Sequence, residues 1–151
     1  MLAVPKTYKV ADTKYILYAA DFRNYSAEIK SVVDFTLPLK AAIEVLHFTW
    51  PGEITFDKKT IETAFKKQYT YGRKIHFENN YAIHSLIQNL QNQIMIRKPS
   101  VLIMFTNQQR TFFQKLFLSS KAEELSFQAK VPLLVSISSR TNNKICIDEL
   151  A

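Results

Sequence analysis

Apolar runs alternate along this chain with amphipathic stretches, and the alternation predicts the elements of an α/β domain. Compact runs of branched and aromatic residues are typical of strands. They cover Lys14–Ala20, Ala42–Thr49, Lys74–Phe77, Ser100–Thr106 and Val131–Ile137. Apolar residues at helical spacing predict helices at Ser26–Lys40, Asp57–Tyr69 and Ala82–Arg97.

The order of these elements predicts an open five-stranded parallel sheet with helices on both faces. The run Ser100–Thr106 is apolar on both faces, which suits a sheet covered on two sides. Proline has no N–H, so Pro132 places the last strand at an edge. For the same reason Pro38 weakens the end of the first helix, and Pro99 stops the third.

A long connection separates the fourth and fifth strands. Ser120 and Glu123 have the spacing of a capping box, which predicts a helix from Ser120 to about Ala129. Asn107–Ser119 is then a long, unusually apolar loop. Loops of that length inside compact α/β units often carry function.

A chain of 151 residues favours a single domain. We divide it into an N-terminal extension or linker (1–12), the domain (13–139) and a polar tail (140–151). No apolar run approaches the length of about 20 residues that a membrane span needs, and the first residues do not resemble a signal peptide. The single cysteine, Cys146, excludes an internal disulfide framework. A cytoplasmic setting is the default expectation.

The formal net charge of +7 is spread unevenly. Arg97–Lys121 contains five cations and no carboxylate, and Asp57–Lys74 contains six cations against two carboxylates. Such a balance attracts polyanions, so a nucleic-acid partner is one hypothesis. No nucleic-acid motif accompanies the charge, which favours a solvated basic face instead.

The sequence offers no motif for catalysis. The two glycines, Gly52 and Gly72, stand far apart, which excludes a Walker loop and the G-x-G-x-x-G dinucleotide motif. The histidines lack the spacing of a zinc hydrolase, and there is no G-x-S-x-G elbow. We interpret His47 and His76 as packed strand histidines. We therefore expect a protein that is not an enzyme and holds no metal.

Three segments carry a resemblance to a known family. They are Tyr15–Phe22, a first strand ending in Asp-Phe; Ile43–Phe48, a second strand with a histidine near its end; and Ser100–Val135. On these segments the chain resembles the universal stress protein family over Thr13–Ser138. The resemblance implies a Rossmann-like fold of the adenine-nucleotide alpha-hydrolase type.

The family's nucleotide motif is Gly, two residues, Gly, nine residues, then Gly followed by Ser or Thr. Thr106, Gln109, Ser119 and Ser120 stand at that spacing, and Ser120 alone keeps the family residue. Side chains at the three lost glycines would occupy space that the phosphates need. The resemblance implies nucleotide contacts from Asp21, Phe48, Phe105, Thr106, Gln109, Ser119 and Ser120, in a degenerate site.

Two functions remain open on this resemblance. The first is a regulatory or scaffolding domain with no cofactor, which dimerises or pairs with another domain through Val131–Val135. The second is an ATP- or AMP-binding stress-response module with altered phosphate contacts. Leu2–Pro5 also resembles the last strand of one such domain and the start of a linker. That pattern fits the second half of a tandem pair.

Overall fold

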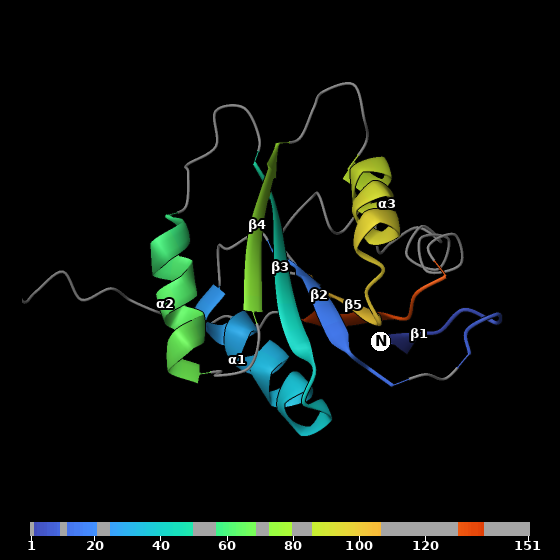
Figure 1. Ribbon diagram of the computed structural model, residues 1–151, viewed down its shortest axis with the longest axis horizontal. Helices are drawn as coiled ribbons and strands as arrows, with labels where there is room; N and C mark the ends of the chain where they lie inside the picture. Colours follow the sequence, from blue (N-terminus) through green and yellow to red (C-terminus); the bar gives the residue numbers. More distant parts are fainter. Residues whose placement is uncertain are drawn as a thin grey trace, which may run out of the picture.

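The computed structural model describes residues 2–9, 12–20, 25–49, 57–68, 73–79, 86–106 and 130–137. In the part of the chain described, helices and strands alternate as the sequence predicts (Figure 1). The strands are β1 (Leu2–Ala3), β2 (Tyr15–Ala19), β3 (Ala42–Thr49), β4 (Arg73–Asn79), β5 (Val101–Thr106) and β6 (Leu133–Ile137). The helices are α1 (Tyr25–Thr36), the 3-10 helix η1 (Leu37–Leu39), α2 (Lys58–Gln68) and α3 (Leu86–Arg97).

The strands form one sheet in the order β1-β6-β5-β2-β3-β4. Strand β2 pairs in parallel with both β3 and β5, and β3–β4 and β5–β6 are parallel as well. The predicted five-stranded parallel sheet is therefore confirmed. Strand β1 lies within Leu2–Pro5, the segment that resembles the last strand of such a domain, and it adds an antiparallel pair next to β6 that the sequence analysis did not predict.

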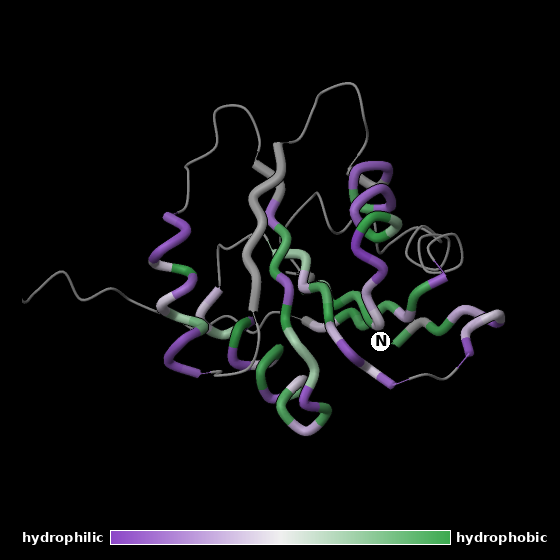
Figure 2. The backbone as a smooth tube through the Cα atoms, viewed as in Figure 1, coloured by the Kyte–Doolittle hydropathy of each residue, from purple (hydrophilic) through white to green (hydrophobic). Residues whose placement is uncertain are grey.

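Side chains of the central strands are buried on both faces of the sheet. In β2, Ile16 and Tyr18 belong to the core on one face, and Leu17 and Ala19 to the core on the other. Because successive strand residues point to opposite faces, a strand covered on both sides needs a continuous apolar run. This is why the strongest apolar runs of the sequence are the central strands (Figure 2).

Helices cover the two faces unequally. Helices α1 and α2 pack on the face of Ile16 and Tyr18, with Ile29 and Phe65 among their buried residues. Helix α3 packs on the opposite face through Leu90 and Ile94 (Figure 1). The predicted arrangement of helices on both faces is confirmed. The lysine-rich side of α2 stays in solvent, and Figure 2 shows that helix as mostly hydrophilic.

Two helices end where proline predicts. The first predicted helix extends to Lys40, but regular α-helix stops at Thr36 and the residues around Pro38 form η1 instead. Helix α3 stops at Arg97, two residues before Pro99. Lys98 then takes a left-handed conformation (φ 50°), and its N–H donates to the carbonyl of Ile94 at 2.8 Å.

The last strand, β6, lies at the edge of the parallel strands, as predicted, but it is not the edge of the whole sheet. Leu2 pairs with Leu134 and Ala3 with Leu133, so β1 lies outside β6. Pro132 itself precedes β6, and its carbonyl accepts a hydrogen bond from the Leu102 N–H at 2.9 Å. The missing N–H of Pro132 therefore removes no donor from within β6. Residues 2 and 3 of the predicted extension are part of the sheet.

Several predictions from the sequence fall outside the described residues. They are the Asn107–Ser119 loop, the Ser120–Ala129 helix, the 140–151 tail with Cys146, and the first residues of the third predicted helix, including His84. His76 lies in β4, of which the backbone is described. These expectations stay predictions.

Replacing Phe65 with alanine tests the packing of α2 on the sheet. Phe65 is fully buried, so truncation removes its contacts and leaves a cavity, at a cost of about 3–5 kcal/mol in the free energy of unfolding. Urea denaturation measures this cost. Lys66→Ala, at the next and exposed position, is the control and should change stability by less than about 0.5 kcal/mol. Equal losses of stability for the two substitutions would contradict the packing of α2 on the sheet through Phe65.

Candidate functional site

Three of the predicted site residues lie at the carboxyl edge of the sheet. Phe105 and Thr106 end β5, and Phe48 stands one residue before the end of β3. Chain order reverses between β2 and β5, because β3 follows β2 on one side while β5 pairs on the other. Ligands of open α/β sheets bind at such a switch point, beyond the carboxyl ends of the strands.

Asp21, Gln109, Ser119 and Ser120 lie outside the described residues. For Phe48 and Thr106 the structure describes the backbone, which continues the ladders to Glu78 and Ile137. Phe105 is described in full. Its side chain is buried, and its ring meets that of Tyr18 edge-on, with centroids 5.7 Å apart and planes at 85°. Phe105 is thus a core residue beneath the carboxyl edge.

His47 fixes the backbone at the end of β2. Its ring, 3% exposed, places Nδ1 2.9 Å from the carbonyl oxygen of Ala20. A carbonyl only accepts, so Nδ1 carries the proton and donates. The N–H of Ala20 donates to the Leu46 carbonyl at 2.9 Å. Both backbone groups of Ala20, the residue before Asp21, are held from β3. The prediction of a packed, hydrogen-bonded histidine is confirmed.

A second buried polar contact links β2 to α1. The hydroxyl of Tyr18 donates to Oε2 of Glu28, and both side chains are buried. Glu28 lies in the first turn of α1, where the helix dipole favours a carboxylate. Sequence reasoning missed this pair. The available signal was spacing, because Glu28 stands four residues before the core residue Val32 and so on the same helix face.

Together these contacts anchor the chain on either side of residues 21–24. Ala20 is held by β3 on one side, and Glu28 is held by Tyr18 on the other. Buried polar groups satisfied in this way are more directional than apolar contacts and specify one arrangement. The structure therefore has a rigid frame around the segment that contains Asp21.

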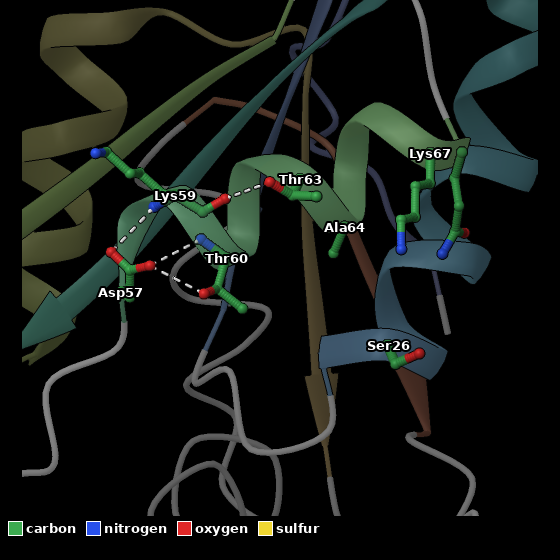
Figure 3. Close-up of a pocket in the computed structure, with 8 residues that line it drawn as sticks. Ser26, Asp57, Lys59, Thr60, Thr63, Ala64 and Lys67 are labelled. Atoms are coloured by element: carbon green, nitrogen blue, oxygen red, sulfur yellow. Dashed lines mark hydrogen bonds between the residues drawn. The ribbon is translucent and has the colours of Figure 1, made fainter.

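A pocket of about 460 Å³ opens elsewhere, along α2 (Figure 3). Its lining comes from α2 with the residue before it and from Ser26 of α1; the α2 side comprises Asp57, Lys59, Thr60, Thr63, Ala64, Lys67 and Gln68. Of the predicted nucleotide contacts that the structure describes, none lines this pocket. Its lysines and hydroxyl groups are exposed, as in the solvated basic face that the sequence indicates.

Asp57, the carboxylate of this pocket, serves as the cap of α2. Its Oδ1 accepts the Lys59 N–H at 3.3 Å, and its Oδ2 accepts the Thr60 N–H at 3.2 Å and the Thr60 hydroxyl at 2.9 Å. These bonds satisfy helix N–H groups that have no partner within the helix. The hydrogen bond from the Thr60 side chain, with the backbone bonds, holds the pKa of Asp57 below its ordinary value of 3.8.

Among the described residues, no group of three or more His, Cys, Asp or Glu side chains is arranged to hold a metal ion. Within the same residues, no helix is long and apolar enough to cross a membrane.

Solved structures of similar fold are universal stress proteins. One, crystallised in complex with cAMP, has a TM-score of 0.63 and 12% identity, over 85% of this chain and all of that chain. A second, from Archaeoglobus fulgidus DSM 4304, has a TM-score of 0.62 and 15% identity, over 85% of this chain and 45% of that one. A third, from Archaeoglobus fulgidus in complex with dAMP, has a TM-score of 0.51 and 12% identity, over 83% and 98%.

No protein-family profile and no curated protein sequence matches the chain. At these identities the likeness concerns the fold, which is that of the universal stress proteins. The fold that the three sequence segments imply is therefore confirmed.

A double-mutant cycle tests the link between β2 and α1. Tyr18→Phe removes a donor from the buried Glu28 carboxylate and should lower the free energy of unfolding by about 1–3 kcal/mol. With Glu28→Gln, the two effects should be non-additive by about 0.5–3 kcal/mol, measured by urea denaturation. Ser31→Ala removes an exposed hydroxyl from the same helix and is the control. Additive effects would show that the contact between Tyr18 and Glu28 does not contribute to the free energy of unfolding.

The cap of α2 should give the protein an acid-dependent stability. Because folding lowers the pKa of Asp57, its contribution to stability is complete above the ordinary value of 3.8 and is lost as the pH falls through the lower folded value. Asp57→Asn keeps a capping side chain without the titration, so its melting temperature should fall less steeply below about pH 4. Identical pH profiles for the two proteins would exclude this role.

Proposed function

We propose that this chain is a regulatory or scaffolding domain of the universal stress protein type, acting in the cytoplasm through protein contacts and without catalysis. The observation that supports the proposal is the position of Thr106. It is the last residue of β5 and lies at the switch-point edge, where the motif of the family begins with glycine. A side chain at that point would take up space and keep a phosphate farther from the backbone than glycine does.

The other motif positions support the same proposal. Gln109 and Ser119 replace the second and third glycines. Glycines in phosphate-binding loops allow backbone N–H groups to wrap the ligand. Three substitutions at motif spacing favour a site that does not bind ATP in the usual way.

Self-association belongs to this proposal. Val131–Val135, which the family resemblance implies as a pairing segment, includes the first residues of β6 at the end of the parallel sheet. Leu133 and Val135 are buried in the core, whereas Leu134 is partly exposed. An apolar strand in this position is suited to antiparallel pairing with its own copy about a two-fold axis.

The second candidate is an ATP- or AMP-binding module with altered phosphate contacts. Two of the similar structures hold cAMP and dAMP, and the sequence keeps Asp21 and Ser120 of the family pattern. The anchored Ala20 favours this candidate too, because it fixes the backbone from which the Asp21 carboxylate would reach a nucleotide.

Calorimetric titration of nucleotide-stripped protein with ATP and AMP, in the presence of magnesium, separates the two candidates. We expect a dissociation constant weaker than about 1 mM, equivalent to less than about 4 kcal/mol of binding free energy. Replacing Thr106, Gln109 and Ser119 together with glycine should then create or strengthen binding.

Micromolar binding that Asp21→Ala abolishes would overturn the scaffold proposal in favour of the nucleotide module. Asp34→Ala, a substitution at an exposed carboxylate on α1, is the matched control and should leave binding unchanged.

A further inference from the structure

Strand β1 lies on the edge that self-pairing would use. It runs antiparallel to β6, with Leu2 opposite Leu134 and Ala3 opposite Leu133. β1 has two residues and β6 has five. The chain therefore covers its own β6 edge with a strand shorter than the edge itself.

Little apolar burial holds β1 in place. Leu2 is 58% exposed and Val4 is 49% exposed, so most of the burial energy available to these side chains is not realised. The firm anchor of the segment comes after β1. Pro5 is buried, and its carbonyl accepts a hydrogen bond from the Tyr8 N–H at 2.9 Å. The segment can thus release β1 while the turn at Pro5 stays in place.

We propose that β1 is a displaceable cover of the β6 edge, which must leave before β6 pairs with β6 of a second copy. This inference rests on the self-pairing in the proposed function and adds its regulation. An edge strand presents one outward row of N–H and C=O groups. Two strands cannot use the same row at Leu133 and Leu134, so the intrachain and interchain pairings exclude one another.

The geometry favours exchange at high protein concentration. β1 already pairs with the edge in the antiparallel direction that a two-fold dimer requires. A second β6 offers five residues in place of the two of β1. Because association follows mass action, residues 2–4 set the concentration at which monomers give way to dimers.

A disulfide that locks β1 in place tests the exclusion. In a Cys146→Ser background, Leu2→Cys and Leu134→Cys introduce thiols at directly opposed positions, within reach of a disulfide in an antiparallel pair. Sedimentation velocity over a range of concentrations measures association of the oxidised and reduced forms. The reduced form has the same residues without the bond and is therefore the matched control.

We expect the oxidised form to stay monomeric at every concentration and the reduced form to dimerise. Because Leu134 lies in the proposed pairing segment, the reduced form, and not the background protein, sets the reference affinity for this comparison. A second variant lacking residues 1–4 should dimerise with a dissociation constant lower by about tenfold or more, which corresponds to about 1.4 kcal/mol or more. Circular dichroism and urea denaturation would confirm that all these proteins are folded.

Two contrary results have different meanings. If the oxidised, intrachain-locked form dimerises as readily as the reduced form, β1 does not compete, and this inference is wrong while self-pairing stands. If the reduced form, the background protein and the truncated variant all remain monomers, self-pairing itself is wrong and the inference fails with it. A disulfide-linked dimer in place of the locked monomer would also overturn the intrachain cover.

Discussion

Strand β2 is the constraint on which the rest of the structure depends. It is hydrogen-bonded on both edges, by β3 and β5, and packed on both faces. Such a strand must be almost entirely apolar, and helices must cover it on two sides. These requirements place α1 and α2 on one face of the sheet and α3 on the other. They also place the reversal of strand order beside β2 itself.

The same constraint explains why the polar contacts near the carboxyl edge are built as they are. A hydroxyl or imidazole within this core must find a partner, because an unsatisfied buried polar group costs about 1–3 kcal/mol. Tyr18 finds Glu28, and His47 finds the carbonyl of Ala20. Satisfying these groups also fixes the backbone on both sides of the segment that contains Asp21.

Sequence patterns could predict the strands and helices because burial on both faces leaves long apolar runs such as Ser100–Thr106. Periodicity could not predict β1, since two residues carry none, and the resemblance of Leu2–Pro5 to a last strand did not say that it pairs with β6. The spacing of Glu28 to Val32 indicates its helix face, but it does not predict burial of the carboxylate, because a carboxylate in a helix normally faces water. Of the candidate site, the structure describes Phe48, Phe105 and Thr106, which lie at the predicted sheet edge. The hydrogen bonds near this edge depend on contacts between distant segments.

This chain has only two glycines and forms tight backbone turns with other residues. Lys40, Lys98 and Lys130 adopt φ values of 50°, 50° and 56°, a region that costs a residue with a Cβ about 1–2 kcal/mol. The first two follow helices, where glycine is the usual choice. Positive φ is therefore within reach of this chain at other residues. In the proposed function, the replacement of the motif glycines would therefore act on a phosphate mainly through side-chain volume, which makes Thr106, at the end of β5, the position to test.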